Sequence, residues 1–151
     1  MGGESGERGP LDDLRGLIDT NIVILLPALN PADLPAEMVI SAITLAELSA
    51  GPHHADGPAE RARRMSVLQH AEATFEPLAF DTAAAQAFGL IAAAVLAAGR
   101  KPRDRIADLM IAATAVANQL PVYTTSPDDF SGLSDLVTIV PVEHVLHRNQ
   151  A

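Results

Sequence analysis

Short apolar runs alternate with helical segments along the chain, and this alternation restricts the fold more than any other feature. Strand-like runs lie at about residues 16–19, 38–41, 75–80, 122–124 and 136–140. Helices are predicted at about 22–26, 43–50, 58–70, 82–98 and 104–118, bounded by Gly, Pro or capping residues. Pro77 marks the run 75–80 as an edge strand. Such alternation predicts an α/β fold of three layers (α/β/α), with a four- to five-stranded parallel sheet covered on both faces.

The length of 151 residues fits one domain, and 48% hydrophobic residues can build a sizeable core. Because only 3% of the residues are aromatic, that core must be aliphatic. Half of the ten glycines lie in the first 16 residues. We therefore expect a disordered N-terminal tail over 1–15, a domain over 16–143 and a C-terminal tail over 144–151.

The chain has no cysteine, which excludes disulfides, thiol catalysis and cysteine-bound metals and suits a reducing cytoplasm. Residues 1–15 do not resemble a signal peptide, and no apolar run approaches the roughly 20 residues that cross a bilayer. We therefore expect no membrane association.

The net charge of −9 disfavours binding to nucleic acid, because phosphate repels an acidic surface. The cations are nevertheless concentrated. Seven of the ten Lys and Arg residues form two clusters, Arg61, Arg63 and Arg64, and Arg100, Lys101, Arg103 and Arg105. These clusters are either solvated helix faces or surfaces that guide a polyanion.

Acidic side chains occur where the predicted strands end or the next helices begin. Asp19 closes the first strand; it is either a helix cap or surplus, since Thr20 and Asn21 are predicted to cap the next helix. Glu47 either completes a capping box with Thr44 or, if Ser41 is the cap, lies free on an apolar helix.

Two further segments carry acids towards the same edge of the sheet. Asp108 lies in an apolar helix, where a carboxylate is costly unless it is paired or bound to a metal; Arg105 is a candidate partner. Asp128 and Asp129 follow the fourth strand and are either first-turn acids or members of the same cluster.

The carboxyl ends of parallel strands meet at one edge of a sheet, where ligands bind. Carboxylates about 4 Å apart repel by roughly 1 kcal/mol in water and about 4 kcal/mol near a protein surface. A divalent cation removes this repulsion, and oxygen ligands without Cys or His favour Mg²⁺, or Mn²⁺, over zinc.

The five histidines lie in loops, at a helix end and in the C-terminal tail, which is typical of structural or solvated residues. No phosphate-binding or dinucleotide-binding glycine motif occurs.

Four segments, in order, resemble the motifs of PIN-domain nucleases, and of VapC-type toxins in particular: Leu17–Asn21, Ile43–Leu48, Arg105–Ala115 and Tyr123–Phe130. The resemblance covers about Leu17 to Val142 and implies a PIN-like fold. It implies a Mg²⁺-dependent endoribonuclease, usually a homodimer, which a small cognate antitoxin neutralises. By motif position, Asp19 and Asp108 are the expected metal ligands, and Glu47 completes the acidic triad. The family often has Asn or Asp where this chain has Ser126. The role of the fourth catalytic acid, for which Asp128 is our candidate, therefore belongs to Asp128, to Asp129 or to neither.

The sequence is compatible with three kinds of protein. The first is the RNA-cleaving toxin, with Leu25, Leu26 and Leu29 as exposed positions for the antitoxin. The second is a noncatalytic PIN-like module that binds RNA or protein; an intact acidic set argues against it. The third is a phosphatase or receiver domain, which needs paired Asp residues and a nearby Lys, whereas the only lysine, Lys101, lies in a linker.

Overall fold

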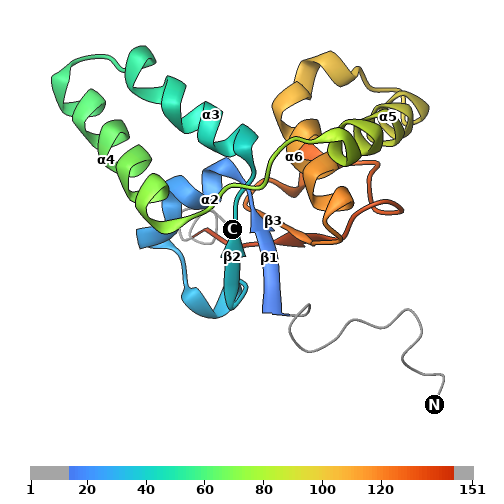
Figure 1. Cartoon of the computed structure of the whole chain (residues 1–151), viewed down its shortest axis with the longest axis horizontal. Helices are drawn as coiled ribbons and strands as arrows, with labels where there is room; N and C mark the ends of the chain where they lie inside the picture. Colours follow the sequence, from blue (N-terminus) through green and yellow to red (C-terminus); the bar gives the residue numbers. More distant parts are fainter. Residues whose placement is uncertain (1–13, 145–151) are drawn as a thin grey trace.

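The computed structural model describes residues 14–144, which form a parallel sheet between helices (Figure 1). The strands are β1 (Arg15–Ile18), β2 (Glu37–Val39), β3 (Val122–Thr124) and β4 (Ile139–Pro141). The α-helices are α2 (Thr20–Leu25), α3 (Ala42–Ala50), α4 (Pro58–Thr74), α5 (Thr82–Ala97) and α6 (Ile106–Ala117). The 3₁₀ turns are η2 (Leu26–Ala28), η3 (Pro31–Asp33), η4 (Gly51–His54), η5 (Pro102–Arg105) and η6 (Pro127–Phe130).

The strand order is β2-β1-β3-β4, and every neighbouring pair is parallel. Leu17 of β1 aligns with Val39 of β2 on one side and with Val122 of β3 on the other. The chain therefore leaves β1 towards one edge and later returns to pair with β1 from the opposite side. This confirms the predicted parallel sheet, with four strands.

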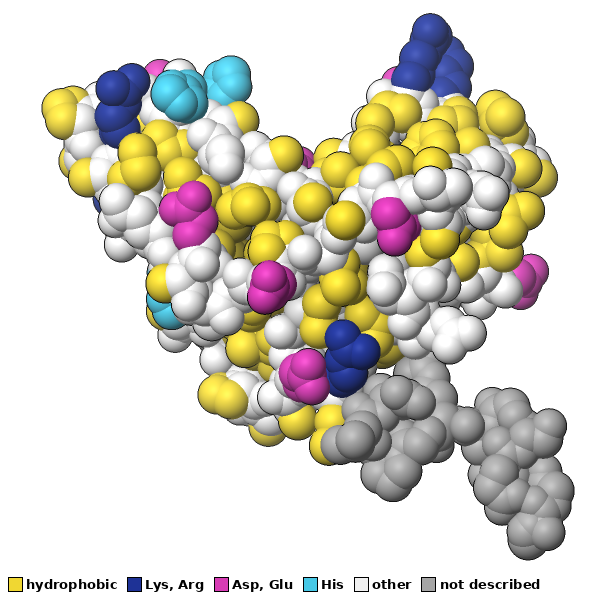
Figure 2. All heavy atoms as spheres, in the orientation of Figure 1, with side chains coloured by type: hydrophobic (Ala, Val, Ile, Leu, Met, Phe, Trp, Pro, Cys, Tyr) yellow, Lys and Arg dark blue, Asp and Glu magenta, His cyan; other side chains and the backbone are white. Residues whose placement is uncertain are grey.

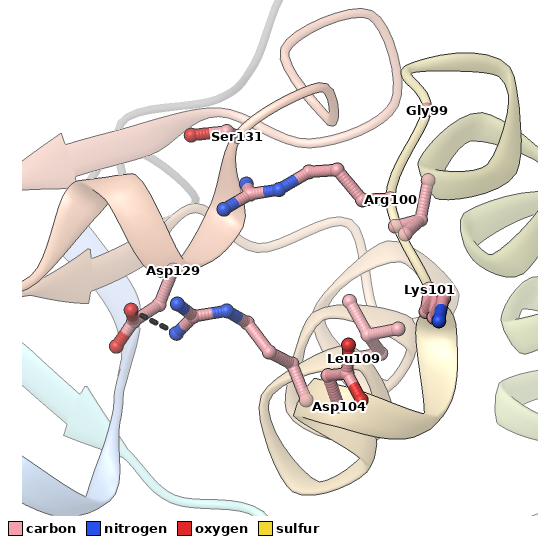
Figure 3. A pocket seen from close by; sticks show the side chains of 9 residues that line it. Gly99, Arg100, Lys101, Asp104, Leu109, Asp129 and Ser131 are labelled. Carbon is pink, nitrogen blue, oxygen red and sulfur yellow. Dashed lines mark hydrogen bonds and ion pairs between the residues drawn. The ribbon is translucent and has the colours of Figure 1, made fainter.

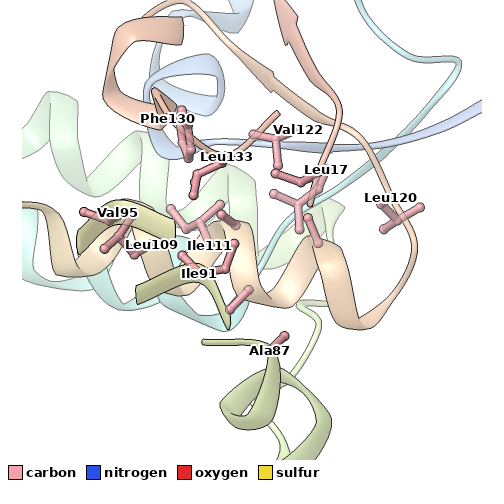
Figure 4. Packing of buried hydrophobic residues seen from close by; sticks show 14 of the residues in the cluster. Leu17, Ala87, Ile91, Val95, Leu109, Ile111, Leu120, Val122, Phe130 and Leu133 are labelled. Atoms are coloured by element: carbon pink, nitrogen blue, oxygen red, sulfur yellow. The ribbon is translucent and has the colours of Figure 1, made fainter. Parts of the chain in front are cut away.

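Alternating strand residues divide the interior into two cores. Leu17 and Val122 pack with α5, α6 and the segment after η6 (Figure 4). Their neighbours Ile18 and Tyr123 face the other side, where Ile18 belongs to a core made with α2, α3 and α4. The period of two in each strand thus produces the predicted three layers.

The predicted strand at 75–80 is wrong, although the segment does lie beside β2. It contributes one isolated parallel bridge, between Ser41 and Leu78. Leu78 N donates to Ile40 O at 2.9 Å, and Ala42 N donates to Leu78 O at 2.8 Å. Pro77 has no N–H to continue the pairing, so the contact stays one residue long.

Other boundaries differ by a few residues. β1 begins at Arg15, one residue inside the predicted N-terminal tail, and Arg15 forms an ion pair with Glu37 of β2. The predicted helix 104–118 is divided into η5 and α6, because Arg105 (φ −143°, ψ 41°) is not helical. The rest of the predicted N-terminal tail, apart from Leu14, and most of the C-terminal tail lie outside the described residues.

The helices form two groups on opposite faces of the sheet, with α3 and α4 in one and α5 and α6 in the other (Figure 1). A space-filling view shows a hollow between the two groups (Figure 2).

Among the described residues no single helix is long and apolar enough to cross a membrane. One bent pair, 82–97 with 102–117 at 115°, passes that test on length and composition alone.

Gly16 provides a test of the sheet packing. A Cβ at this position would collide with the Tyr123 ring and lie 3.0 Å from Pro35 Cβ. We expect Gly16→Ala to lower the free energy of unfolding by about 1–3 kcal/mol, the usual cost of overpacking. Gly89→Ala in α5 is the matched control: nothing lies within 4 Å of its Cβ, and alanine favours the helix. Urea denaturation measures the free energy of unfolding of both variants. Equal stability of the two variants would contradict this packing.

Candidate active site

The site lies at the carboxyl ends of β1 and β3, which are neighbours although more than 100 residues separate them in the sequence. The connections from these strands run to opposite sides of the sheet, which leaves a crevice between them. Asp19 follows β1 and is held there by its backbone, since Asp19 N donates to Tyr123 O at 3.1 Å.

Asp19 is itself the N-cap of α2, which corrects the prediction that Thr20 or Asn21 caps this helix. Its Oδ1 accepts from Ile22 N at 3.0 Å, and its side chain also bonds to the side chain of Thr124. Asp19 is only 5% exposed. Burial raises the pKa of Asp19 above its usual range, although both hydrogen bonds oppose the shift. The carboxylate is therefore fixed in place while its charge remains poorly solvated.

Glu47 does not serve as a capping residue. Ser41 caps α3, with Ser41 Oγ accepting from Thr44 N at 3.1 Å, and Glu47 lies exposed one turn further along. The Thr20 hydroxyl donates to Glu47 Oε1 at 2.5 Å and lies 3.0 Å from Thr44 Oγ1. The residue after Asp19 thus orients the second acid of the site.

Asp108 lies half-buried in the first turn of α6. Its burial raises the pKa to about 6, and the negative charges of Asp129, Glu47 and Asp19 add to this shift. The alternative that Arg105 neutralises Asp108 is not supported, since the ion pair of Arg105 is with Asp129. Arg105 lowers the pKa of Asp108 only as the smallest of the contributions.

Asp129, rather than Asp128, is the acid that η6 brings to this group. The charge of Asp129 raises the pKa of both Asp19 and Asp108, and its carboxylate is half-buried. The side chain of Asp128 is exposed, and it is the backbone carbonyl of this residue that accepts from Ser131 Oγ at 2.8 Å. The structure therefore brings Asp129 close to the other acids and leaves the Asp128 side chain exposed.

The four carboxylates act on one another electrostatically, but within residues 14–144 no three acids or histidines are arranged to hold one metal ion together. Mg²⁺ does not need such a cage, because it is usually bound by one or two carboxylates together with substrate phosphates. An all-oxygen donor set with mutual repulsion fits a divalent cation. Asp19 and Asp108 are the two residues suited to hold it.

The sequence did not reveal the polar residues that support the acids. Thr20, Thr44 and Thr124 place hydroxyl groups among them, and both Thr44 and Thr124 are fully buried. The only available signal was position, since Thr20 follows Asp19 directly and Thr124 ends the neighbouring strand. Threonine is common in strands and turns for other reasons, so this signal is weak.

Comparison with known proteins agrees with this geometry. A PIN domain family model matches residues 17–136. The chain is 38% identical to Ribonuclease VapC4 of Mycobacterium tuberculosis over 128 residues, which is 83% of this chain and 95% of that protein. It is 34% identical to Ribonuclease VapC5 of the same organism, over 82% of this chain and 91% of the relative. The crystal structure of VapBC-5 from M. tuberculosis, a member of the VapBC family of toxin-antitoxin systems, superposes with a TM-score of 0.74. The identity is 32%, over 86% of this chain and 98% of that chain.

The raised pKa of Asp108 predicts that this residue destabilises the metal-free protein near neutral pH. The folded state favours the protonated acid, so the free energy of unfolding falls as pH rises from about 4 through about 6. We expect Asp108→Asn to remove much of this fall and to gain about 1–2 kcal/mol at pH 7, a value reduced for partial exposure.

Urea denaturation at several pH values, with a metal chelator present, measures this effect. Asp128→Asn is the matched control, because its side chain is exposed and should change stability little. If Asp108→Asn and the wild type lose stability in parallel over this range, Asp108 is not the strained carboxylate.

Proposed function

The chain belongs to the PIN-domain family, and on that premise we propose that it is a Mg²⁺-dependent endoribonuclease toxin, neutralised by a small antitoxin. The observation that carries this proposal is the meeting of Asp19, Glu47, Asp108 and Asp129 from four separate segments at one edge of the sheet. The ribonuclease names of the relatives over nearly the whole chain support the same reaction.

Asp19 and Asp108 are proposed to hold the cation, which is Mg²⁺ or, alternatively, Mn²⁺. When bound, such an ion supplies positive charge to the scissile phosphate and acidifies water. Asp19 is held in position by Ile22 N and Thr124, so little side-chain freedom is lost on binding. Asp108 has a raised pKa, and a cation beside it would favour the charged form that can ligate.

Glu47 is proposed to orient the attacking water and to accept its proton. It is exposed, so water reaches it, and its contact with Thr20 leaves the second carboxylate oxygen available. Asp129 is proposed to act with the other acids, and its ion pair with Arg105 controls where its carboxylate points. These roles require attack on phosphorus in line with the leaving oxygen.

The arrangement of the four acids argues against a noncatalytic module. A module that only binds RNA or protein has no need of four repelling carboxylates, which lower stability and repel phosphate. The phosphatase or receiver alternative needs a second Asp next to the nucleophilic one, whereas Asp19 is followed by Thr20 and Asn21.

A groove beside the acids is the proposed site for the antitoxin. It has a volume of about 510 Å³ and lies between α2, α3 and α4, with Ile24, Leu48 and Val67 as apolar lining and Glu47 at one end. Ile24 is 47% exposed. The expectation that Leu25, Leu26 and Leu29 receive the partner is not supported: Leu29 is buried, and the other two are half-buried against the core. A partner in this groove would also cover Glu47.

We further propose a homodimer that works in the cytoplasm. The outer face of α5 supports the dimer, because Leu90 and Leu96 are 60% and 61% exposed and residues 82–97 contain no charge. The absence of cysteine is compatible with a reducing compartment.

Asp19→Asn tests the catalytic proposal. Asparagine caps a helix as well as aspartate does, so the fold should persist, while the loss of the charged ligand should lower RNA cleavage in Mg²⁺ at least about 100-fold. Cleavage of single-stranded RNA by the purified protein measures this. Wild-type cleavage by the variant would refute the role of Asp19.

Asp19→Ala is the matched control for the helix cap. It removes the same charge together with the acceptor for Ile22 N, and should cost about 1 kcal/mol of stability relative to the asparagine variant. A thermal shift that separates the two variants, with both inactive, distinguishes the role in folding from the role in catalysis.

Ile24→Glu tests the groove. The new charge should weaken binding of a small cognate antitoxin by at least about tenfold, because it places an unpaired carboxylate in an apolar contact. RNA cleavage should remain, since Ile24 lies outside the acidic group. Co-purification and calorimetry measure the binding. Unchanged affinity, with Met65→Glu as a matched surface control on α4, would exclude this groove.

A further inference from the structure

A second cavity adjoins the acidic group on the side away from the groove. It has a volume of about 360 Å³ and lies between the end of α5, η5, the start of α6 and η6 (Figure 3). Its charged and polar lining consists of the cations Arg100, Lys101 and Arg105, the acids Asp104 and Asp129, and Ser131. Asp129 thus lines this cavity and also acts on Asp19 and Asp108. Asp129 is therefore shared between this cavity and the proposed catalytic centre.

Arg100 and Lys101 in this cavity form no ion pair with any described residue, whereas Arg105 is paired with Asp129. Residues 14–144 contain eight Lys and Arg residues, of which Arg15, Arg63, Arg64 and Arg105 are in ion pairs. Of the four that are not in ion pairs in this part of the chain, three lie in one segment, at 100, 101 and 103. In the other basic cluster two of the three arginines are neutralised, because Glu60 forms ion pairs with both Arg63 and Arg64.

The backbone fixes this segment in place. Gly99 has a φ of +79°, Gly99 N donates to Leu96 O at 2.9 Å, and Arg100 N donates to Val95 O at 3.0 Å. This arrangement ends α5 and leads the chain into η5. The side chain of Arg100 extends towards the segment that carries Ser131 (Figure 3). Its one hydrogen bond, to Asp128 O, is long at 3.3 Å, so most of its five N–H donors remain for a ligand.

We propose that Arg100 and Lys101 form a subsite for an RNA phosphate next to the scissile bond. A strand whose reacting phosphate lies at the four acids must continue past Asp129 on one side, and this cavity meets it there with positive charge. In a protein of net charge −9, a local cationic segment is needed to offset the repulsion between the acids and the polyanion. This inference rests on the proposed ribonuclease function.

The test compares two double variants that remove the same charge. Arg100→Gln with Lys101→Gln removes the subsite, and Arg15→Gln with Arg61→Gln removes two cations from β1 and α4. Binding of a short fluorescent single-stranded RNA is measured by anisotropy with a chelator, so that no strand is cut. We expect the subsite variant to bind about tenfold more weakly, and its salt slope to fall by about 1.4, the value for two single-strand phosphate contacts. The control should stay within about twofold of the wild type.

Lys101 allows a second measurement that does not depend on a variant folding. It is the only lysine in the chain, so acylation of a side-chain amine by an acetyl ester reports on this position alone. We expect RNA to slow the acylation of Lys101 in the wild type, as followed by mass spectrometry. Polyglutamate at equal charge should protect it much less; equal protection would indicate a site for acidic protein instead and would overturn the proposal.

Cleavage assays separate this proposal from the proposed function. If the wild type cleaves RNA in Mg²⁺, the subsite variant should show a KM raised about tenfold with kcat within about twofold. Cleavage with an unchanged KM, equal weakening of both double variants, or no RNA binding by the wild type would each overturn the subsite. Loss of binding in the subsite variant, with no cleavage by any form, would refute the nuclease and leave the subsite standing.

Discussion

Repulsion between carboxylates is the constraint on which the rest of the site depends. Burial raises the pKa of Asp19 and of Asp108, and the charges of Glu47 and Asp129 add to both shifts. A chain keeps such a group only if the rest of the fold is stable enough to hold it. Here the cost is carried by two aliphatic cores, one on each face of a four-stranded sheet.

The same elements that build those cores also position the acids. Ile18 is buried beneath α2, and the next residue is the capping Asp19. The buried residues Leu109, Ile111 and Ala112 fix α6 in the core, and Asp108 lies in the first turn of this helix. Each acid is therefore adjacent in sequence or within one helical turn of a side chain that the core fixes. This explains how four short segments that lie far apart in the sequence hold their acids in one arrangement.

The sequence predicted the layers because they follow from local pattern, and Asp19, Glu47 and Asp108, which it singled out, lie near one another in the structure. Strand alternation and helix caps are read over a few residues, and Asp19, Glu47 and Asp108 each lie beside such a signal. The segment 75–80 misled because its apolar composition suits a strand, whereas pairing depends on a partner edge and on Pro77. The choice between Asp128 and Asp129 could not be made from sequence. It depends on the turn of η6 and on Arg105, which lies 24 residues away.

Asp19 combines two roles that different residues often divide, since one side chain caps α2 and is the proposed ligand. Only the second role needs a negative charge. A codon for aspartate becomes one for asparagine by a single base change, so an allele without catalysis but with an intact helix lies one mutational step from the active gene. Such a product would still present the apolar groove between α2, α3 and α4. Selection against a harmful enzyme could therefore convert it into a stable decoy that occupies the same partner.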